Sequence, residues 1–302
     1  MPDTRFSVRI QGISRKYTGP EKIKQSRIRR LSSSMRRLII DCHTHFSTFG
    51  HEGQTFGQVR DSLLRAMQKH GIDYAFVYPD SEPNTKVADL DTTLKLVKDY
   101  PNLLMLGTTS IPALDERTID RLDALALNST IIGIKLYPGF EKFYPSDERC
   151  HGIYNKCIEH NMPVVFHSGE TMNETWREEY NHPSEIAKVA GQFPSLKIVV
   201  AHFSQPHLND CRNLILNHTN VYADISGLAH ADVVKACGQD AIYRCLSEVA
   251  TARPEKLLFG TDWPLCDVRE HLSLVESLPV SEAAKALILS ENAQKVFALE
   301  LE

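Results

Sequence analysis

Apolar, β-rich runs alternate with segments of helical periodicity along most of this chain, and this alternation restricts the fold more than any other feature. Eight runs lie at residues 38–43, 73–78, 103–109, 131–137, 163–167, 197–202, 220–225 and 256–262. Amphipathic stretches follow at 57–70, 86–99, 116–127, 147–160, 183–192, 207–217, 231–251, 269–277 and 281–299. The predicted class is therefore α/β, a (β/α)8 TIM barrel with an extra C-terminal helical segment. A doubly wound sheet is the alternative, although the chain has no GxGxxG or P-loop motif.

Four of the predicted strands end in a residue that can bind a metal ion. The first run leads into His43-Thr44-His45, and later runs lead into His167, His202 and Asp262. Residues two apart on a strand point the same way, so the two imidazoles of the first pair can hold one ion. For so short a motif, two histidines that bind no metal are an equally good interpretation. Its recurrence at four strand ends, which meet at one face of a barrel, favours a metal site.

Composition restricts the class of protein and its partners. The length of 302 residues, with 42% hydrophobic and 24% charged residues, suits a single globular domain. A net charge of −4 favours neither nucleic acid nor a membrane surface as partner, and no apolar run approaches the roughly 20 residues that span a bilayer. The seven cysteines are odd in number and include no CxxC pair. Free thiols in a reducing compartment explain them best, so we expect a cytoplasmic protein.

The first residues differ from the rest in charge. Residues 1–37 contain eleven Lys/Arg and two Asp/Glu, and they lack the apolar core of a secretory signal. Their composition resembles that of a transit peptide, and a basic arm that binds an anionic partner is a second interpretation. We expect residues 1–36 to be a poorly ordered or peripheral extension and residues 37–302 to form the barrel.

Several motifs between residues 37 and 299 carry a family resemblance. They are IIDCHTHF (39–46), GIKLYPGF (133–140), PVVFHSGE (163–170), PSLKIVVAHFS (194–204), VYADISG (221–227), LLFGTDWP (257–264) and ILSENAQKVFAL (288–299). With these motifs the chain resembles the amidohydrolase superfamily of metal-dependent TIM-barrel hydrolases. The resemblance is to the amidohydrolase-related branch that includes aminocarboxymuconate semialdehyde decarboxylase.

The resemblance implies one divalent metal ion, usually zinc, bound by His43, His45, His167 and Asp262. It also implies that Asp262 accepts the proton of a metal-bound water as this water attacks a carbonyl. His202 would orient that water or polarise the substrate oxygen, and the alternatives for it are a second metal ligand or a core histidine. Both Asp262 and His202 are therefore candidate catalytic residues.

Three further residues are candidates for contact with substrate. Lys135 interrupts an apolar run, where an unpaired ammonium is costly. Three roles remain open for it: a carboxylated bridge between two metal ions, a buried partner of a carboxylate such as Asp224, or a polar wall of a one-metal site, which we prefer. Phe46 and Trp263 flank the predicted ligands, and they either contact the substrate or pack in the apolar core.

The predicted function is a metal-dependent hydrolase that cleaves an amide, ester or lactone bond through a zinc-bound hydroxide. The alternative enzyme is a nonoxidative decarboxylase of an unsaturated or aromatic carboxylic acid on the same site. Such a lyase needs a cation for the carboxylate; the loop 46–53 contains no arginine, whereas Arg177 follows the fifth strand. A catalytically inactive barrel that binds a partner is the third hypothesis. The expected partner is a small-molecule substrate, and a homodimer is compatible with the sequence.

Overall fold

The strands of the barrel follow one another around a ring in chain order. The structure is a computed structural model that describes residues 7–10, 13–16, 37–170 and 178–301. A three-stranded sheet contains β3, β4 and β5, and a six-stranded sheet runs from β6 to β11, with parallel pairing throughout. The strands are β3 (Ile40–Thr44), β4 (Tyr74–Val77), β5 (Leu103–Met105), β6 (Gly107–Thr108), β7 (Ile134–Leu136), β8 (Pro163–Phe166), β9 (Lys197–Val200), β10 (Val221–Asp224) and β11 (Leu257–Leu258).

Backbone hydrogen bonds join the two sheets into a closed barrel. Cys42 N donates to Phe259 O at 2.9 Å, and Asp262 N donates to His43 O at 2.8 Å, so the first strand meets the segment after β11. On the other side, β6 follows β5 after the single residue Leu106, whose N donates to Val77 O of β4 at 3.1 Å, and Ile132 N, ahead of β7, donates to Met105 O of β5 at 3.0 Å. The predicted α/β TIM barrel is confirmed, with the run 103–109 divided into two short strands.

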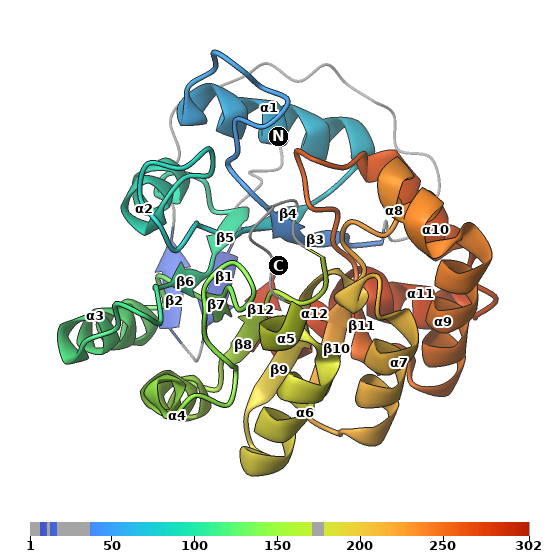
Figure 1. Ribbon diagram of the computed structural model, residues 1–302. Helices are drawn as coiled ribbons and strands as arrows, with labels where there is room; N and C mark the ends of the chain where they lie inside the picture. The colour runs from blue at the N-terminus through green and yellow to red at the C-terminus, as the bar shows by residue number, and fades with distance from the viewer. Residues whose placement is uncertain (1–6, 11–12, 17–36, 171–177, 302) are drawn as a thin grey trace, which may run out of the picture.

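Helices surround the strands, as Figure 1 shows. The first helix illustrates why they begin and end where they do: Thr55 and Gln58 form a capping box, and Gly71 ends the helix with φ 74°. The predicted helix at 231–251 is two helices separated by Gly238. The helices are α1 (Phe56–His70), α2 (Leu90–Val97), α3 (Glu116–Leu127), η1 (Glu148–Cys150), α4 (His151–Glu159), α5 (Glu178–Asn181), α6 (Pro183–Gln192), η2 (Ala201–Ser204), α7 (Leu208–Asn217), α8 (Ala231–Cys237), α9 (Gln239–Ala252), η3 (Pro254–Lys256), α10 (Val268–Ser277), α11 (Glu282–Ala286), η4 (Leu287–Glu291) and α12 (Asn292–Val296).

Alternate strand residues build two separate apolar layers. One set, which includes Ile40 and Phe76, forms a cluster with Phe297 and other residues of the C-terminal segment, and the rings of Phe76 and Phe297 are 4.8 Å apart. The other set packs against the surrounding helices. Lys197, the first residue of β9, donates to Val296 O at 2.9 Å. The expected C-terminal helical segment therefore covers the end of the barrel where the strands begin, which leaves the opposite end for the strand-end residues.

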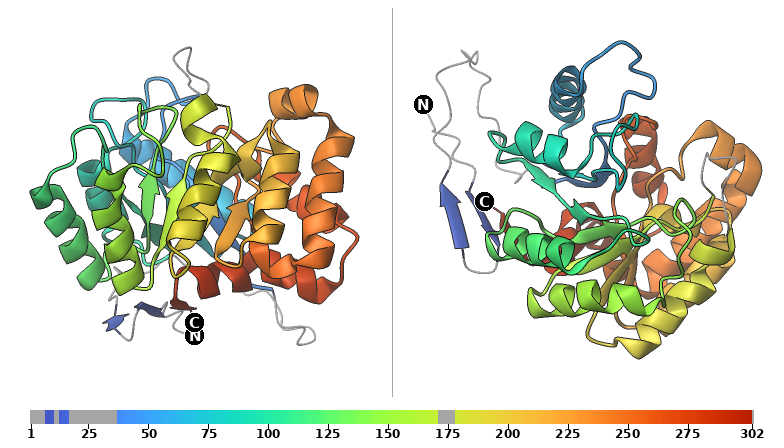
Figure 2. Two further views of the ribbon diagram at one scale, coloured as in Figure 1. Left: turned by 60° about the horizontal axis from the view of Figure 1, so that its bottom comes forward. Right: turned by 60° about the vertical axis from the view of Figure 1, so that its left-hand side comes forward.

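A small antiparallel sheet lies outside the barrel (Figure 2). Strand β1 (Ser7–Ile10) pairs with β2 (Ile13–Lys16) and with β12 (Leu299–Leu301) near the C-terminus. The sequence analysis predicted no strand in the basic extension, and the rest of residues 1–36 lies outside the described residues. Within the described part of the chain, no helix combines the length and apolarity needed to cross a membrane.

Candidate metal centre

The strand-end residues His43, His45 and Asp262 come together at one point. The register of β3 against β4 shifts between Asp41 and Thr44, and His45 follows the last residue of the strand. Asp262 Oδ1 lies 3.3 Å from His45 Nε2 and 3.8 Å from His43 Nε2. These three atoms are close enough to bind one ion.

Hydrogen bonds on the far side of each ring orient the two histidines. His43 Nδ1 lies 2.9 Å from Asp224 Oδ2, and both side chains are fully buried. His45 Nδ1 lies 2.9 Å from the carbonyl oxygen of Tyr78. Both oxygens can only accept, so each Nδ1 carries a proton and each Nε2 faces Asp262, where a neutral ring would present its lone pair. Lone pairs that face a carboxylate oxygen repel it unless a cation lies between them, so the donor set fits a divalent metal ion.

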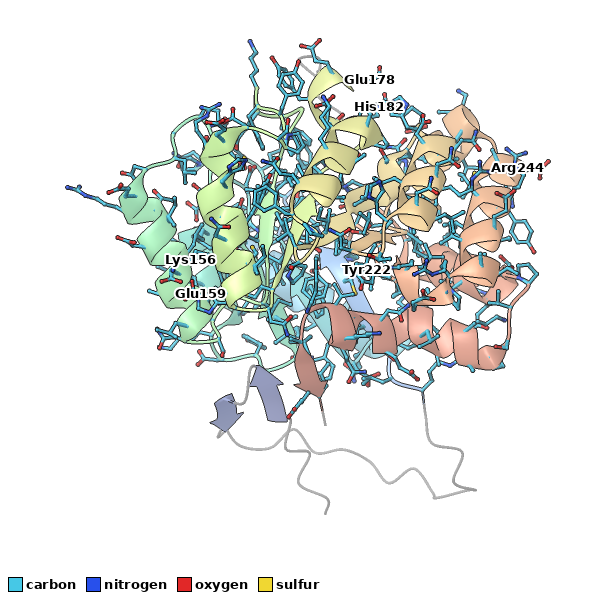
Figure 3. All side chains as sticks on the ribbon, turned by 90° about the horizontal axis from the view of Figure 1, so that it is seen from below. Lys156, Glu159, Glu178, His182, Tyr222 and Arg244 are labelled. Carbon is cyan, nitrogen blue, oxygen red and sulfur yellow. The ribbon has the colours of Figure 1, made fainter. Side chains whose placement is uncertain are left out.

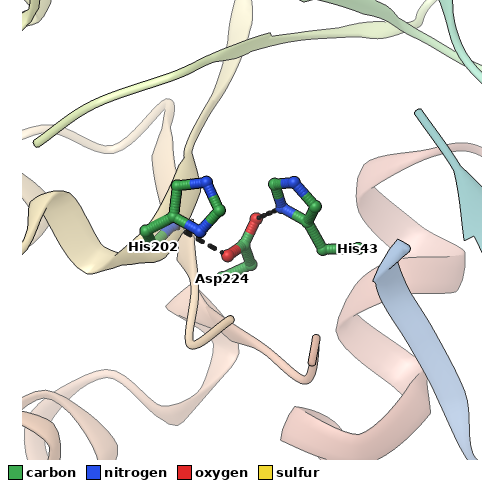
Figure 4. Close-up of side chains that lie close together, drawn as sticks. All are labelled: His43, His202 and Asp224. Atoms are coloured by element: carbon green, nitrogen blue, oxygen red, sulfur yellow. Dashed lines mark hydrogen bonds and ion pairs between the residues drawn. The ribbon is translucent and has the colours of Figure 1, made fainter. Parts of the chain in front are cut away.

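Asp224 also joins His43 to His202, as Figure 4 shows. His202 N donates to Asp224 Oδ1 at 2.9 Å, and Ser226 Oγ lies 2.8 Å from His202 Nδ1. His43, His202 and Asp224 form a second, buried group of donor atoms that could hold a divalent ion. The two groups share His43, and neither one determines which metal is bound.

Burial and mutual charge set the protonation of these groups. Burial is the main cause that lowers the pKa of His43 to about 3, and Asp224 opposes it. Burial alone would raise the pKa of Asp262, but the neighbouring His202 and His45 hold it below its ordinary value. Burial likewise opposes ionisation of Asp224, and the contact with His43 outweighs it, so this pKa is also lowered. Neutral imidazoles beside ionised carboxylates are the protonation states that bind zinc and related ions.

Lys135 lies inside the barrel on β7 and is fully buried. Its Nζ has no hydrogen-bond partner among the described residues, and it lies 5.1 Å from the ring centre of Tyr78 and 5.2 Å from that of Tyr137. Burial lowers the pKa of Lys135 to about 8, although Asp224 and Asp262 partly oppose this. The ion pair with Asp224 that the sequence left open is not among those of the described residues, because Asp224 bonds His43 and His202 instead.

His167 lies beside both donor groups and belongs to neither of them. It follows β8, and its ring centre is 5.1 Å from that of His202 and 4.7 Å from that of Phe140. Within the part of the chain that the structure describes, its buried Nε2 has no hydrogen-bond partner. Both predicted aromatic walls belong to the buried apolar core. Phe46 is fully buried there, and Trp263 is 8% exposed, with its ring 5.6 Å from that of His51.

The sequence analysis did not assign Asp224 and Ser226 to the site. Asp224 is the last residue of β10, and Asp262 likewise follows β11. Its position at a strand end could therefore have indicated that Asp224 belongs to the site. His202 and Asp262 also adopt positive φ angles, of 58° and 70°, which are rare for residues other than glycine. Strained backbone of this kind is frequent at functional sites.

Comparison with known protein families identifies the family of this chain: a family model described as amidohydrolase matches residues 40–299. The chain belongs to the amidohydrolase family. Comparison of this amidohydrolase with curated protein sequences found no match.

Solved structures share the fold of this amidohydrolase at low sequence identity. An uncharacterized TIM-barrel protein from Bordetella bronchiseptica is 20% identical, with a TM-score of 0.65 over 86% of this chain and 98% of that one. A probable 2-pyrone-4,6-dicarboxylic acid hydrolase from Acinetobacter baumannii, with citric acid bound, is 16% identical, with a TM-score of 0.61 over 86% and 99%. 5-Carboxyvanillate decarboxylase from Sphingomonas paucimobilis is 14% identical, with a TM-score of 0.58 over 87% and 99%. One barrel architecture thus accommodates both a hydrolase and a decarboxylase.

Proposed function

We propose that this amidohydrolase is a metal-dependent hydrolase that cleaves an amide, ester or lactone bond of a small molecule. The observation that carries the proposal is the carboxylate of Asp262, which faces Nε2 of His45 at 3.3 Å and Nε2 of His43 at 3.8 Å. One divalent ion, zinc by the preference of these donors, would be held by both histidines and Asp262, with the unpartnered Nε2 of His167 as a further donor. Such an ion polarises a carbonyl and lowers the pKa of a bound water to about 7.

The surrounding residues supply proton transfer and charge. Asp262 is ionised at neutral pH, because its pKa is lowered, and it accepts a proton from the attacking water. His202 is held through Ser226 and Asp224 with its ring centre 4.6 Å from that of His43, where it polarises the substrate oxygen. Lys135 contributes a buried ammonium that no described residue pairs, which suits an anionic group of the substrate.

The second candidate function is nonoxidative decarboxylation, and the buried ammonium of Lys135 beside the site favours it. A carboxylate substrate needs a cation, and this ammonium is fully buried beside the site and forms no ion pair with the residues that the structure describes. Arg177, the other cation that the sequence offers, lies outside the described residues. Oligomeric state and cytoplasmic location stay predictions.

A substrate panel tests these functions directly. Lactones, esters, amides and unsaturated carboxylic acids are supplied to the zinc-loaded protein, and acid release and carbon dioxide are both measured. Acid release supports hydrolysis, carbon dioxide alone supports the lyase, and no turnover with tight substrate binding supports the inactive barrel.

Variants then test the proposed roles. We expect His202→Ala to retain metal and lose roughly 100-fold in turnover, as for a lost acid–base group, whereas Asp262→Asn should lose both metal and turnover. His218→Ala is the control, since His218 lies at the end of α7, outside both donor groups. Full activity of His202→Ala would remove this residue from the mechanism.

A further inference from the structure

A second cluster of metal-binding side chains lies on the segments that follow β8 and β9. Glu178 Oε1 lies 2.9 Å from His207 Nε2, and the ring centres of His182 and His207 are 4.7 Å apart. One donor atom from each of these three residues lies within 4.8 Å of the others. Asp210 Oδ2 is 3.7 Å from His182 Nε2 and supplies a second carboxylate. This cluster shares no residue with the centre at His43.

Local structure holds the two rings in place. His182 precedes the first residue of α6, and its Nδ1 lies 2.9 Å from Ser184 Oγ and 3.2 Å from Ser184 N. His207 precedes α7, and its backbone N donates to Ser204 O at 2.8 Å. Figure 3 shows Glu178 and His182 together on the side of the molecule away from the β1–β2 hairpin. The donors thus come from two segments that are distant in sequence, on the side where the strands end.

We propose that Glu178, His182 and His207 form a second site for a divalent transition metal such as zinc, with Asp210 as an additional ligand. Two imidazoles with one or two carboxylates suit zinc, nickel or copper, whereas calcium and magnesium favour oxygen ligands alone. In the structure His182 Nδ1 accepts from Ser184 N at 3.2 Å. Coordination by His182 Nε2 requires the proton on Nδ1, so metal binding would exchange this cap for a hydrogen bond from Nδ1 to Ser184 Oγ, which lies 2.9 Å away.

Comparison with a similar cluster shows why this one is favoured. Asp123, Glu159 and His160 also place three donors close together, but the ammonium of Lys156 already occupies that position. Lys156 Nζ lies 3.3 Å from Asp123 and 3.0 Å from Glu159, and Figure 3 shows Lys156 and Glu159 side by side. Among the described residues, the cluster at His182 has no lysine or arginine paired with its carboxylates.

The position of this second site connects it to the barrel. At the base of the same two segments, Ser168 Oγ donates to Asn181 O at 2.7 Å and lies 2.7 Å from Ser204 Oγ. Ser168 follows His167 in sequence, and Ser204 is two residues after His202. An ion at the second site would therefore fasten α5 and α6 to the start of α7 and stabilise the segments that carry these two histidines.

Calorimetric titration of the chelator-treated protein with zinc chloride tests the proposal. We expect two classes of site in the native protein and loss of one class in the His182→Ala/His207→Ala variant. Glu178→Gln removes one ligand from an exposed position without a change in size, and it should weaken the same class at least tenfold. Added zinc should also raise the melting temperature of the native protein more than that of either variant.

His218→Ala/His230→Ala is the matched control, because His230 caps α8 through Nδ1 just as His182 caps α6. This control should retain both classes of site. The proposal is overturned by a single class of site in the native protein, by an unchanged isotherm in Glu178→Gln, or by an equal loss in the control. Circular dichroism shows whether each variant is folded before its isotherm is interpreted.

Discussion

Asp224→Asn is the substitution that most directly tests how the metal centre is built. Asp224 accepts from His43 Nδ1 and from the backbone N–H of His202, both at 2.9 Å, through different oxygens. Asparagine keeps one acceptor oxygen and replaces the other with a donor. If its oxygen stays on His202 N, its amide faces His43 Nδ1, and the imidazole proton must move to Nε2. That nitrogen faces Asp262, so the substitution blocks the atom that is expected to bind the metal.

The size of this effect follows from the role of the carboxylate. Loss of an outer partner of a ligating histidine costs 10–100-fold in metal affinity, which is about 1.4–2.8 kcal/mol. The volume of the side chain hardly changes, and the fold should therefore stay intact. If Asp224 instead binds the metal directly with His202, the loss should exceed about 100-fold, since a ligand and not its partner is removed.

Competition with a chromophoric chelator measures the zinc affinity of the native protein and of Asp224→Asn, and circular dichroism checks the fold. Asp123→Asn is the matched control, because Asp123 also bonds a histidine, His160 at 2.7 Å, away from the site. Native affinity in Asp224→Asn would refute the reasoning, and so would an equal loss in Asp123→Asn.

Two further predictions concern stability. Gly169→Ala should lower the free energy of unfolding by about 3 kcal/mol, because Gly169 has φ +93° and an added Cβ would lie 2.0 Å from Gln205 O. Thermal unfolding measures this loss. In the same assay Gly191→Ala, which adds a Cβ into open space, should be neutral or slightly stabilising. Burial lowers the pKa of Lys256 from 10.5 to about 8. Between these two pH values the unfolded chain therefore binds more protons than the native protein, so the free energy of unfolding rises as pH rises from 8 to 10.5. Relative to Lys256→Met, this gain should reach at most about 3 kcal/mol in denaturant unfolding. A constant difference between the two proteins across this pH range would contradict the assignment.

The barrel could be predicted because its signal is local. Strand and helix periods are read within a few residues, and the helices at 116–127 and 183–192 begin and end where the sequence places them. The small sheet at the termini could not be predicted in this way. Val8 pairs with Leu301, and nothing near either residue indicates a partner at the other end of the chain.

The sequence indicates which residues lie at the candidate site better than it indicates their partners. The structure brings His43, His45 and Asp262 together at the ends of their strands, and their role as metal ligands stays a prediction. For Asp224, the sequence offered Lys135 as a partner on the basis of charge alone. The choice of His43 instead depends on the orientation of an imidazole and on a backbone N–H of His202, which only the folded chain determines.

The direction of the candidate metal-binding side chains depends on Asp41, a residue to which the sequence assigned no role. Asp41 Oδ1 accepts from His43 N at 3.2 Å and from Thr261 N at 3.0 Å, and Oδ2 accepts from Thr261 Oγ1 at 2.6 Å. One buried carboxylate therefore holds the residue before Asp262 against the backbone of His43. Strand alternation predicts side-chain direction only for regular strands, and here a register shift and a positive φ at Asp262 interrupt it. These hydrogen bonds, and not the period of the strands, explain why the imidazoles and the carboxylate converge.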